Sequence, residues 1–186
     1  MLDESQLNVY VLDSNLSPRQ KERLQAQVLT ALRSLPPWMF ALLSQRLEMI
    51  GAKNLPLVVE ARSPDDPSTQ VVSFGEIEGR PAARLMPRLT EDGIDWEHDP
   101  KLLVAKAAAY MAAPPAGDAF WQRWSDAVAV DRLRETDPVA EGEWKDASDL
   151  DLFLEMCAVY VTRPDHGYWA RFAASRSFFD EWRDSA

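Results

Sequence analysis

The sequence predicts an α+β domain that is mostly helical, with a small mixed or antiparallel sheet between N-terminal helices and a C-terminal helical half. Strand-like apolar runs gather in residues 55–90, and apolar spacing typical of helices occupies residues 100–183. Because these segments are segregated along the chain and do not alternate, the pattern favours α+β over a parallel α/β sheet. The 186 residues, with seven Trp and seven Phe, suit a single folded domain over 1–186.

The N-terminal part predicts an extended arm followed by two helices. Ser17-Pro18 is typical of a helix start, since Ser is a good N-cap and Pro fits the first helical position. Pro36-Pro37 ends this helix and starts a second one, for which Gly51 is the expected stop. The expected segments are an arm or short strand over 1–16, with its strand candidate at 7–13, and helices over 17–51.

The middle of the chain predicts the strands of the sheet. Residues 55–61 are mostly apolar and predict a strand, and Pro56 within them indicates a strand start or a sheet edge. Residues 70–74 and 82–86 are two further strand candidates, which 75–81 separates.

The C-terminal half predicts helices, of which Pro114-Pro115 separates the first two. Ser148 begins a capping pattern in which Asp151 takes the third helical position. Aromatic rings recur at spacings of three and four in the second and last of these helices, which favours burial in the core over a partner surface. The helices are expected over 100–113, 117–133, 149–162 and 168–183.

The net charge of −10 and the pI of about 4.7 narrow the choice of partners. An acidic protein repels phosphates and anionic lipid, so neither nucleic acid nor a membrane is expected, whereas a basic protein partner suits the charge. The other explanation of the charge is solubility alone. Because the chain opens without a basic leader and has no apolar stretch long enough to span a bilayer, we expect a cytoplasmic protein.

Few residues suited to catalysis or metal binding occur. The two histidines, His98 and His166, are far apart in sequence, and the single Cys157 sits in an apolar run that predicts a buried side chain. The seven glycines form no phosphate-binding loop. Acids at the start of the 149–162 helix could in principle serve a glycosidase-type reaction, but such acids are more often capping features. No cofactor is expected.

A helical segment rich in aromatic and acidic residues occupies 151–160, reads Asp-Leu-Phe-Leu-Glu-Met-Cys-Ala-Val-Tyr, and continues as Val-Thr-Arg-Pro over 161–164. It resembles the Glu-Phe-Phe-Ala-Glu-Ala-Phe segment that carries the third metal ligand in zincin-type zinc metallopeptidases, in the group that includes the anthrax lethal factor catalytic domain. The layout of residues 35–183 also resembles that family. The resemblance implies that Asp151 matches the third ligand and Trp144 a tyrosine upstream of it.

The same resemblance implies a degenerate metal site. In the family, a preceding helix carries His-Glu-x-x-His, with two imidazoles on one face and a Glu that activates the metal-bound water. The matching helix has Ala105 and Ala109 at the histidine positions and Lys106 at the glutamate position, and Asp151 and Glu155 complete the set. Alanine offers no lone pair and lysine adds positive charge, so we expect neither bound metal nor peptidase activity.

An acidic segment around a tryptophan is the strongest candidate for a partner surface. Trp144 lies near four acids, an arrangement typical of an aromatic hot spot with steering charge. These acids are Glu141, Glu143, Asp146 and Asp149. The alternative is a solvated connection whose tryptophan folds back into the core.

These features favour a non-catalytic protein-binding module, a pseudoenzyme that acts as a regulator, adaptor or immunity-type protein of bacterial style. Two alternatives stay open: a hydrolase with an unrecognised acid-based or metal site, and a structural subunit that forms homo-oligomers. The alanine-rich helix over 102–113 also has an explanation that requires no family, since small side chains let a buried helix pack closely.

Overall fold

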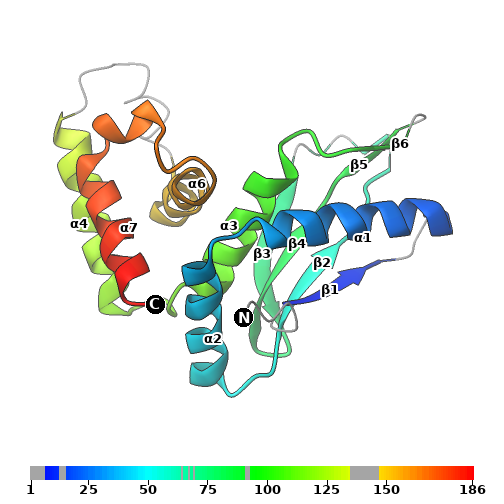
Figure 1. The fold of residues 1–186 in the computed structure, drawn as a ribbon, viewed down its shortest axis with the longest axis horizontal. Helices are drawn as coiled ribbons and strands as arrows, with labels where there is room; N and C mark the ends of the chain where they lie inside the picture. The colour runs from blue at the N-terminus through cyan, green and yellow to red at the C-terminus, as the bar shows by residue number, and fades with distance from the viewer. Residues whose placement is uncertain are drawn as a thin grey trace.

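A computed structural model shows the arrangement of the helices and strands (Figure 1). It describes residues 7–12, 16–63, 65–66, 68, 70–90, 93–134 and 147–186. The described elements are β1 (Leu7–Val11), α1 (Pro18–Arg33), α2 (Pro37–Ile50), β2 (Leu55–Val59), β3 (Val72–Ile77), β4 (Arg80–Leu85), β5 (Arg88–Thr90), β6 (Gly93–Asp95), α3 (Pro100–Ala112), α4 (Ala119–Arg134), α6 (Asp149–Thr162), the 3-10 helix η2 (Gly167–Ala170) and α7 (Ala173–Asp184). Helices predominate and the sheets are small, so the α+β class expected from the sequence is confirmed.

The helix boundaries at the N-terminal end follow the local signals in the sequence. Ser17 caps α1: its hydroxyl accepts the backbone N–H of Gln20, and the Gln20 side chain accepts the backbone N–H of Ser17 in return. Pro37 opens α2, and Gly51 ends it in the left-handed conformation at φ 65°. These predictions are confirmed.

The main sheet is mixed. Its strand order is β1-β2-β4-β3, with β1, β2 and β4 parallel and β3 antiparallel to β4. Helices α1 and α2 form the crossover that parallel β1 and β2 require. Pro56 is the second residue of the central strand β2, so the expected strand start is confirmed and the sheet-edge alternative is wrong.

Strands β3 and β4 form a hairpin through the two-residue turn Glu78-Gly79. Both turn residues have positive φ, 53° and 72°, as the twist of such a turn requires. Most of residues 75–81 thus belongs to strands, so their expected role as a separator is wrong. Pro81 is tolerated because the pairing of β4 with β2 begins only at Ala83. The short hairpin β5–β6 was not expected, since three-residue strands show no periodicity.

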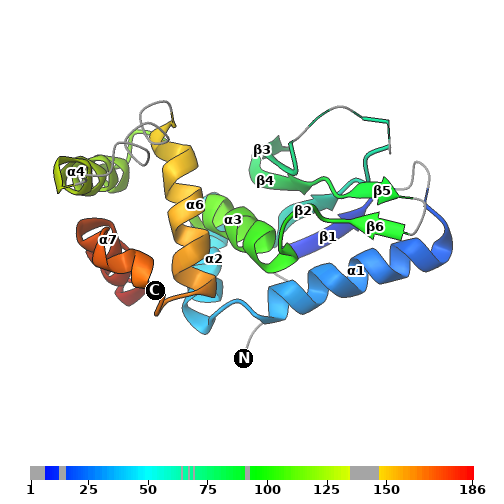
Figure 2. The ribbon, with the colours of Figure 1, turned by 90° about the horizontal axis from the view of Figure 1, so that it is seen from above.

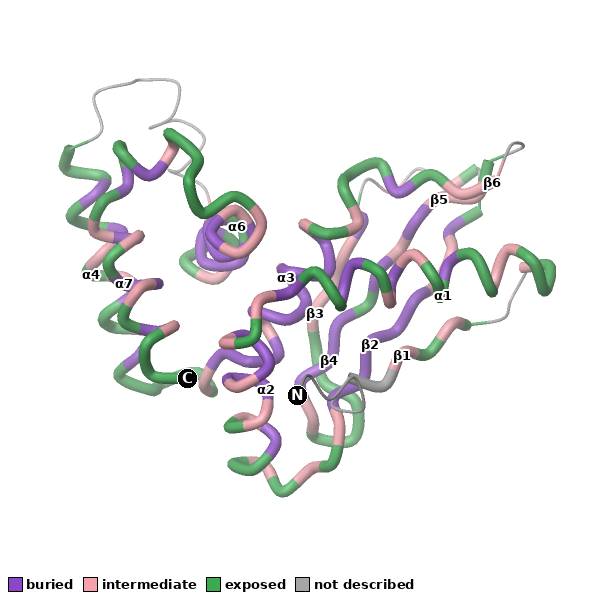
Figure 3. The backbone as a smooth tube through the Cα atoms, viewed as in Figure 1, coloured by how far each residue is buried: buried purple, intermediate pink, exposed green. Residues whose placement is uncertain are grey.

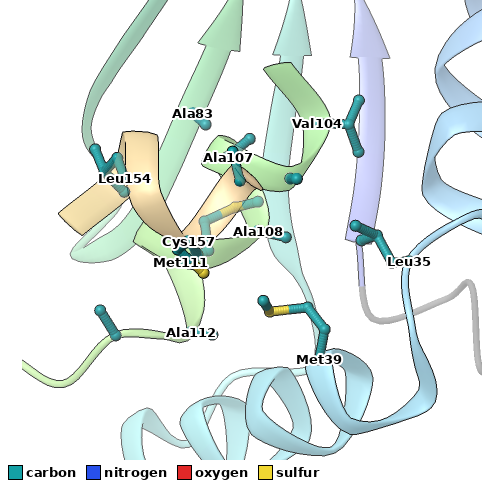
Figure 4. Packing of buried hydrophobic residues seen from close by; sticks show 14 of the residues in the cluster. Leu35, Met39, Ala83, Val104, Ala107, Ala108, Met111, Ala112, Leu154 and Cys157 are labelled. Carbon is teal, nitrogen blue, oxygen red and sulfur yellow. The ribbon is translucent and has the colours of Figure 1, made fainter. Parts of the chain in front are cut away.

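Helix α3 is the centre of the fold. It crosses one face of the main sheet and packs against α1, α2 and α6, while α4 and α7 lie on the far side of α6 (Figures 1 and 2). Burial is concentrated in α3, in the strand β2 and in the facing side of α6 (Figure 3). Figure 4 shows small side chains of α3 gathered with Cys157, Met39 and Ala83 from three other elements. The expected burial of Cys157 is confirmed.

The final helical stretch is divided, so its expected course as one helix over 168–183 is wrong. After η2, Phe172 leaves helical geometry at φ −118° and ψ 53°, and α7 begins at the next residue. The reason is a tertiary cap: the buried carboxylate of Asp131 in α4 accepts the backbone N–H groups of Ala174 at 3.0 Å and Ser175 at 2.8 Å.

Most aromatic residues of α4 and of the last segment are core residues, as expected, whereas Trp121 and Tyr168 are half-buried. The rings that are buried are those of Phe120, Trp124, Trp169, Phe172, Phe178, Phe179 and Trp182. Many of them pack edge-to-face or tilted at centroid separations favourable for aromatic pairs.

None of the described helices has the length and apolar character that crossing a membrane requires.

Candidate functional site

Lys106 of α3 and Glu155 of α6 form an ion pair across the interface of the two helices, with the Lys106 ammonium donating to the Glu155 carboxylate. The Lys106 side chain is 17% exposed and that of Glu155 is 62% exposed, so the pair sits at the rim of the interface. The neighbouring Ala105 and Ala109 are fully buried. The structure therefore brings together two of the residues that the sequence placed in one site, with alanine packing beside them.

Asp151 has a local role at the start of α6. Its backbone N–H donates to the Ser148 hydroxyl oxygen at 3.1 Å, which confirms the expected cap. Its carboxylate accepts from the same hydroxyl group at 2.6 Å. The reciprocal bond of a full capping box, to the Ser148 backbone N–H, is replaced by this one because the aspartate side chain is shorter than that of glutamate.

The residues at the positions implied for zinc do not suit the metal. Two methyl groups and an ammonium ion offer no lone pair, and catalytic zinc takes three protein ligands. Within the described ranges, no three His, Cys, Asp or Glu side chains lie close enough together to hold a metal ion. His98 and His166 are exposed, and His166 Nδ1 accepts the backbone N–H of Tyr168 at 3.1 Å as the cap of η2.

Tyr168 extends the polar cluster around Glu155. Burial, followed by the nearby Glu155 carboxylate, raises the pKa of Tyr168 to about 12. The Tyr168 phenol is therefore protonated at neutral pH, and it accompanies the Lys106–Glu155 ion pair. These groups can form hydrogen bonds and ion pairs, but none of them is an activated nucleophile.

The acidic partner surface expected from the sequence falls mostly outside the described residues. This applies to Trp144, Glu141, Glu143 and Asp146. Asp149 is described: its backbone oxygen accepts the indole N–H of Trp124 at 2.8 Å, and its carboxylate accepts the Ser125 hydroxyl. Asp149 thus joins α6 to α4, in addition to any role at the surface.

A pocket that the sequence did not indicate lies beside the β3–β4 hairpin. Its volume is about 470 Å³, within the range of ligand sites. It is bounded by α2, the hairpin, the C-terminal end of α3 and the 113–117 connection, with α4 and α6 closing one side. The side chains that define it are Arg46, Glu76, Tyr110, Pro114, Trp121 and Leu150. Each comes from a different segment of the chain, so no local motif marks the pocket.

Several contacts hold the walls of this pocket in place. The Tyr110 hydroxyl donates to the Gly75 carbonyl oxygen at 3.3 Å, and the Tyr110 ring packs on Phe74 at 4.9 Å between centroids. The Trp121 indole N–H donates to the Pro114 carbonyl oxygen at 3.1 Å. The two aromatic walls are thereby tied to the edge strand and to the loop between α3 and α4.

Comparison with family models, with curated proteins and with solved structures finds no match for this chain.

Proposed function

We propose that this protein is a non-catalytic, cytoplasmic protein-binding module on a degenerate zincin-like scaffold, acting as a regulator, adaptor or immunity-type protein. The observation that supports this most is the Lys106–Glu155 ion pair beside buried Ala105 and Ala109. At the positions that the family resemblance assigns to metal chemistry, the side chains serve helix packing.

The packing of α3 on α6 favours this interpretation over a site whose ligands are displaced. Ala105 and Ala109 are completely enclosed, and Cys157 of α6 lies in the same core cluster. Replacing a buried methyl by a larger side chain costs about 1–3 kcal/mol through overpacking. The core around these two positions is therefore adapted to alanine, and an imidazole at either position would require the surrounding side chains to move.

The charge of the chain favours a protein partner with a basic surface. Acids exceed bases by ten, and the acidic residues that the sequence singles out around Trp144 would steer a cationic partner and disfavour nucleic acid. Asp149, at one end of this acidic group, is bound to the helical half through its carboxylate and its backbone oxygen, which both accept hydrogen bonds from residues of α4.

The test is affinity capture from the native cell with the full chain as bait, followed by mass spectrometry. We expect capture to fall at least tenfold when Trp144→Ala is combined with lysine at Glu141, Glu143 and Asp146. The matched control places lysine at exposed acids on α1 and α2, as Glu22→Lys with Glu48→Lys, and should capture the partner normally. Equal capture by both variants would refute the acidic surface.

The pseudoenzyme part of the proposal has a separate test. We expect elemental analysis of freshly purified protein to give far less than one zinc per chain, and casein to remain uncleaved. One zinc per chain, together with cleavage that a chelator abolishes, would overturn the proposal and favour the hydrolase alternative.

A further inference from the structure

Arg46, near the end of α2, is a cation that no carboxylate of the described residues pairs with. Its Nε is buried and donates to no acceptor, and its Nη1 contacts only the sulfur of Met49, a weak acceptor, at 3.3 Å. The other arginines around the sheet behave differently: Arg62 and Arg84, for example, pair with Glu97 and Glu60. A buried donor without an acceptor is costly and is uncommon in folded proteins, so an anionic ligand beside Arg46 would be favourable.

Arg46 lines the pocket of about 470 Å³ beside the hairpin. Glu76 and Tyr110 line the same pocket, where burial and then the Glu76 carboxylate raise the pKa of Tyr110 and Arg46 lowers it. The rest of the wall is apolar, with Pro114, Trp121 and Leu150.

The arginine, the tyrosine and the apolar side chains that line this pocket together indicate which kind of ligand it would bind. A guanidinium binds a carboxylate through two parallel N–H donors, and the Tyr110 hydroxyl lies on the same wall. One arginine with an acid nearby suits a monoanion better than a phosphate dianion. The apolar wall suits a hydrophobic side chain, and Glu76 on the exposed edge strand suits a cation further along the ligand.

We propose that this pocket binds the C-terminal carboxylate of a partner peptide, with Arg46 as the anchor for the carboxylate. The apolar wall takes the last side chain of the peptide, and Glu76 favours a lysine or arginine upstream. The net charge of −10 favours the same basic character. This inference rests on the proposed protein-binding function and specifies the part of the partner that is recognised.

The test begins with selection from a display library of random hexapeptides that end in a free carboxylate, using the full chain as bait. We expect enrichment of apolar last residues and of upstream lysine or arginine. The best peptide is then synthesised as the free acid and as the amide, and fluorescence polarisation should give at least tenfold weaker binding of the amide. Selection without enrichment, or equal binding of acid and amide, would overturn the assignment.

Variants then locate the anchor. We expect Arg46→Gln to weaken binding of the free acid at least tenfold and to abolish the difference between acid and amide. Arg46→Lys, which keeps the charge but loses the two-pronged geometry, should lie between. Arg23→Gln, at an exposed position on α1 outside this pocket, is the matched control and should bind normally. If Arg46→Gln fails to fold, the acid–amide difference and Arg46→Lys decide the result.

Competition separates a peptide site from a site for small carboxylates. If N-acetyl-leucine displaces the hexapeptide at the concentration of the peptide itself, the pocket serves a small molecule and the peptide assignment is wrong.

Failure of this inference and failure of the proposed function are distinguishable in the capture experiment. If Arg46→Gln captures the partner normally while the acidic-segment variant does not, the binding function stands and the pocket assignment fails. If the acidic-segment variant captures the partner as well as its control does but Arg46→Gln does not, the pocket assignment stands and the acidic partner surface fails.

Discussion

Replacement of Asp131 tests how a single tertiary contact determines where α7 begins. The Asp131 carboxylate is completely buried and accepts two backbone N–H groups at the first turn of α7, at 3.0 Å and 2.8 Å. In Asp131→Asn, the amide oxygen keeps one of these bonds, but the amide NH₂ group faces the other N–H donor. The lost bond to a charged group is worth about 1.5–3 kcal/mol, and the lost charge at the helix N-terminus about 0.3–1 kcal/mol.

We therefore expect Asp131→Asn to lower the free energy of unfolding by about 2–4 kcal/mol. In a chain of this length, about 3 kcal/mol corresponds to a decrease in Tm of roughly 6–12 °C. Asp131→Ala, which leaves both donors without an acceptor, should cost about 3–5 kcal/mol. Urea denaturation followed by tryptophan fluorescence gives the free energies, and circular dichroism gives the Tm.

The control for Asp131 is Asp126→Asn on the same helix. Asp126 is exposed and accepts one bond from the Gln122 side chain at 2.9 Å, so its replacement should change stability by less than about 0.5 kcal/mol. If Asp131→Asn is as stable as this control, the carboxylate does not determine the start of α7.

Three further predictions concern buried or polar groups elsewhere. Cys157 is fully buried, and burial raises the pKa of its thiol, so Ellman's reagent should modify it only as fast as the protein unfolds; rapid labelling of the native protein would contradict its burial. The pKa of Tyr168 is about 12 in the folded state and about 10 in the unfolded chain. The protonated phenol therefore contributes its full stabilisation below pH 10, and this stabilisation is lost progressively as the pH rises from 10 to 12. The urea midpoint should therefore fall less steeply over this range in Tyr168→Phe, and equal slopes would disprove the link. The Arg62 side chain is 5% exposed and pairs with the Glu97 carboxylate at 2.6 Å, so Glu97→Ala should lower the free energy of unfolding, measured by urea denaturation, by about 2–3 kcal/mol. Glu60 forms a more exposed pair, and Glu60→Ala should cost less than about 1 kcal/mol. Equal costs for the two variants would refute this difference.

Most helix boundaries were predictable because local chemistry sets them. Ser17-Pro18, Pro36-Pro37 and Gly51 satisfy or remove backbone donors within a few residues of themselves, so they have the same effect in almost any fold. The hairpin turn was hidden because Gly75 and Pro81 resemble loop residues. In the fold they are tolerated in the ladder, since Pro81 lies beyond the paired part of β2.

The candidate sites were predictable only in part. The resemblance in sequence grouped Lys106 with Glu155, and the structure brings the two side chains into contact. It gave no indication of the pocket around Arg46, because the lining residues come from six segments and share no spacing. Whether an arginine has a carboxylate partner depends on the side chains that the fold places around it, and the sequence alone does not give these.

The sequence by itself determined the class of the fold, the capped ends of the first two helices, the burial of Cys157 and the close packing that alanines allow at the centre of α3. These depend on composition, on apolar period and on bonds between near neighbours. Only the tertiary structure decided the parallel order of β1, β2 and β4, the break at Phe172 and the position of Arg46 in a pocket. Each of these depends on groups distant in the chain, whose approach is determined by the packing of the whole core.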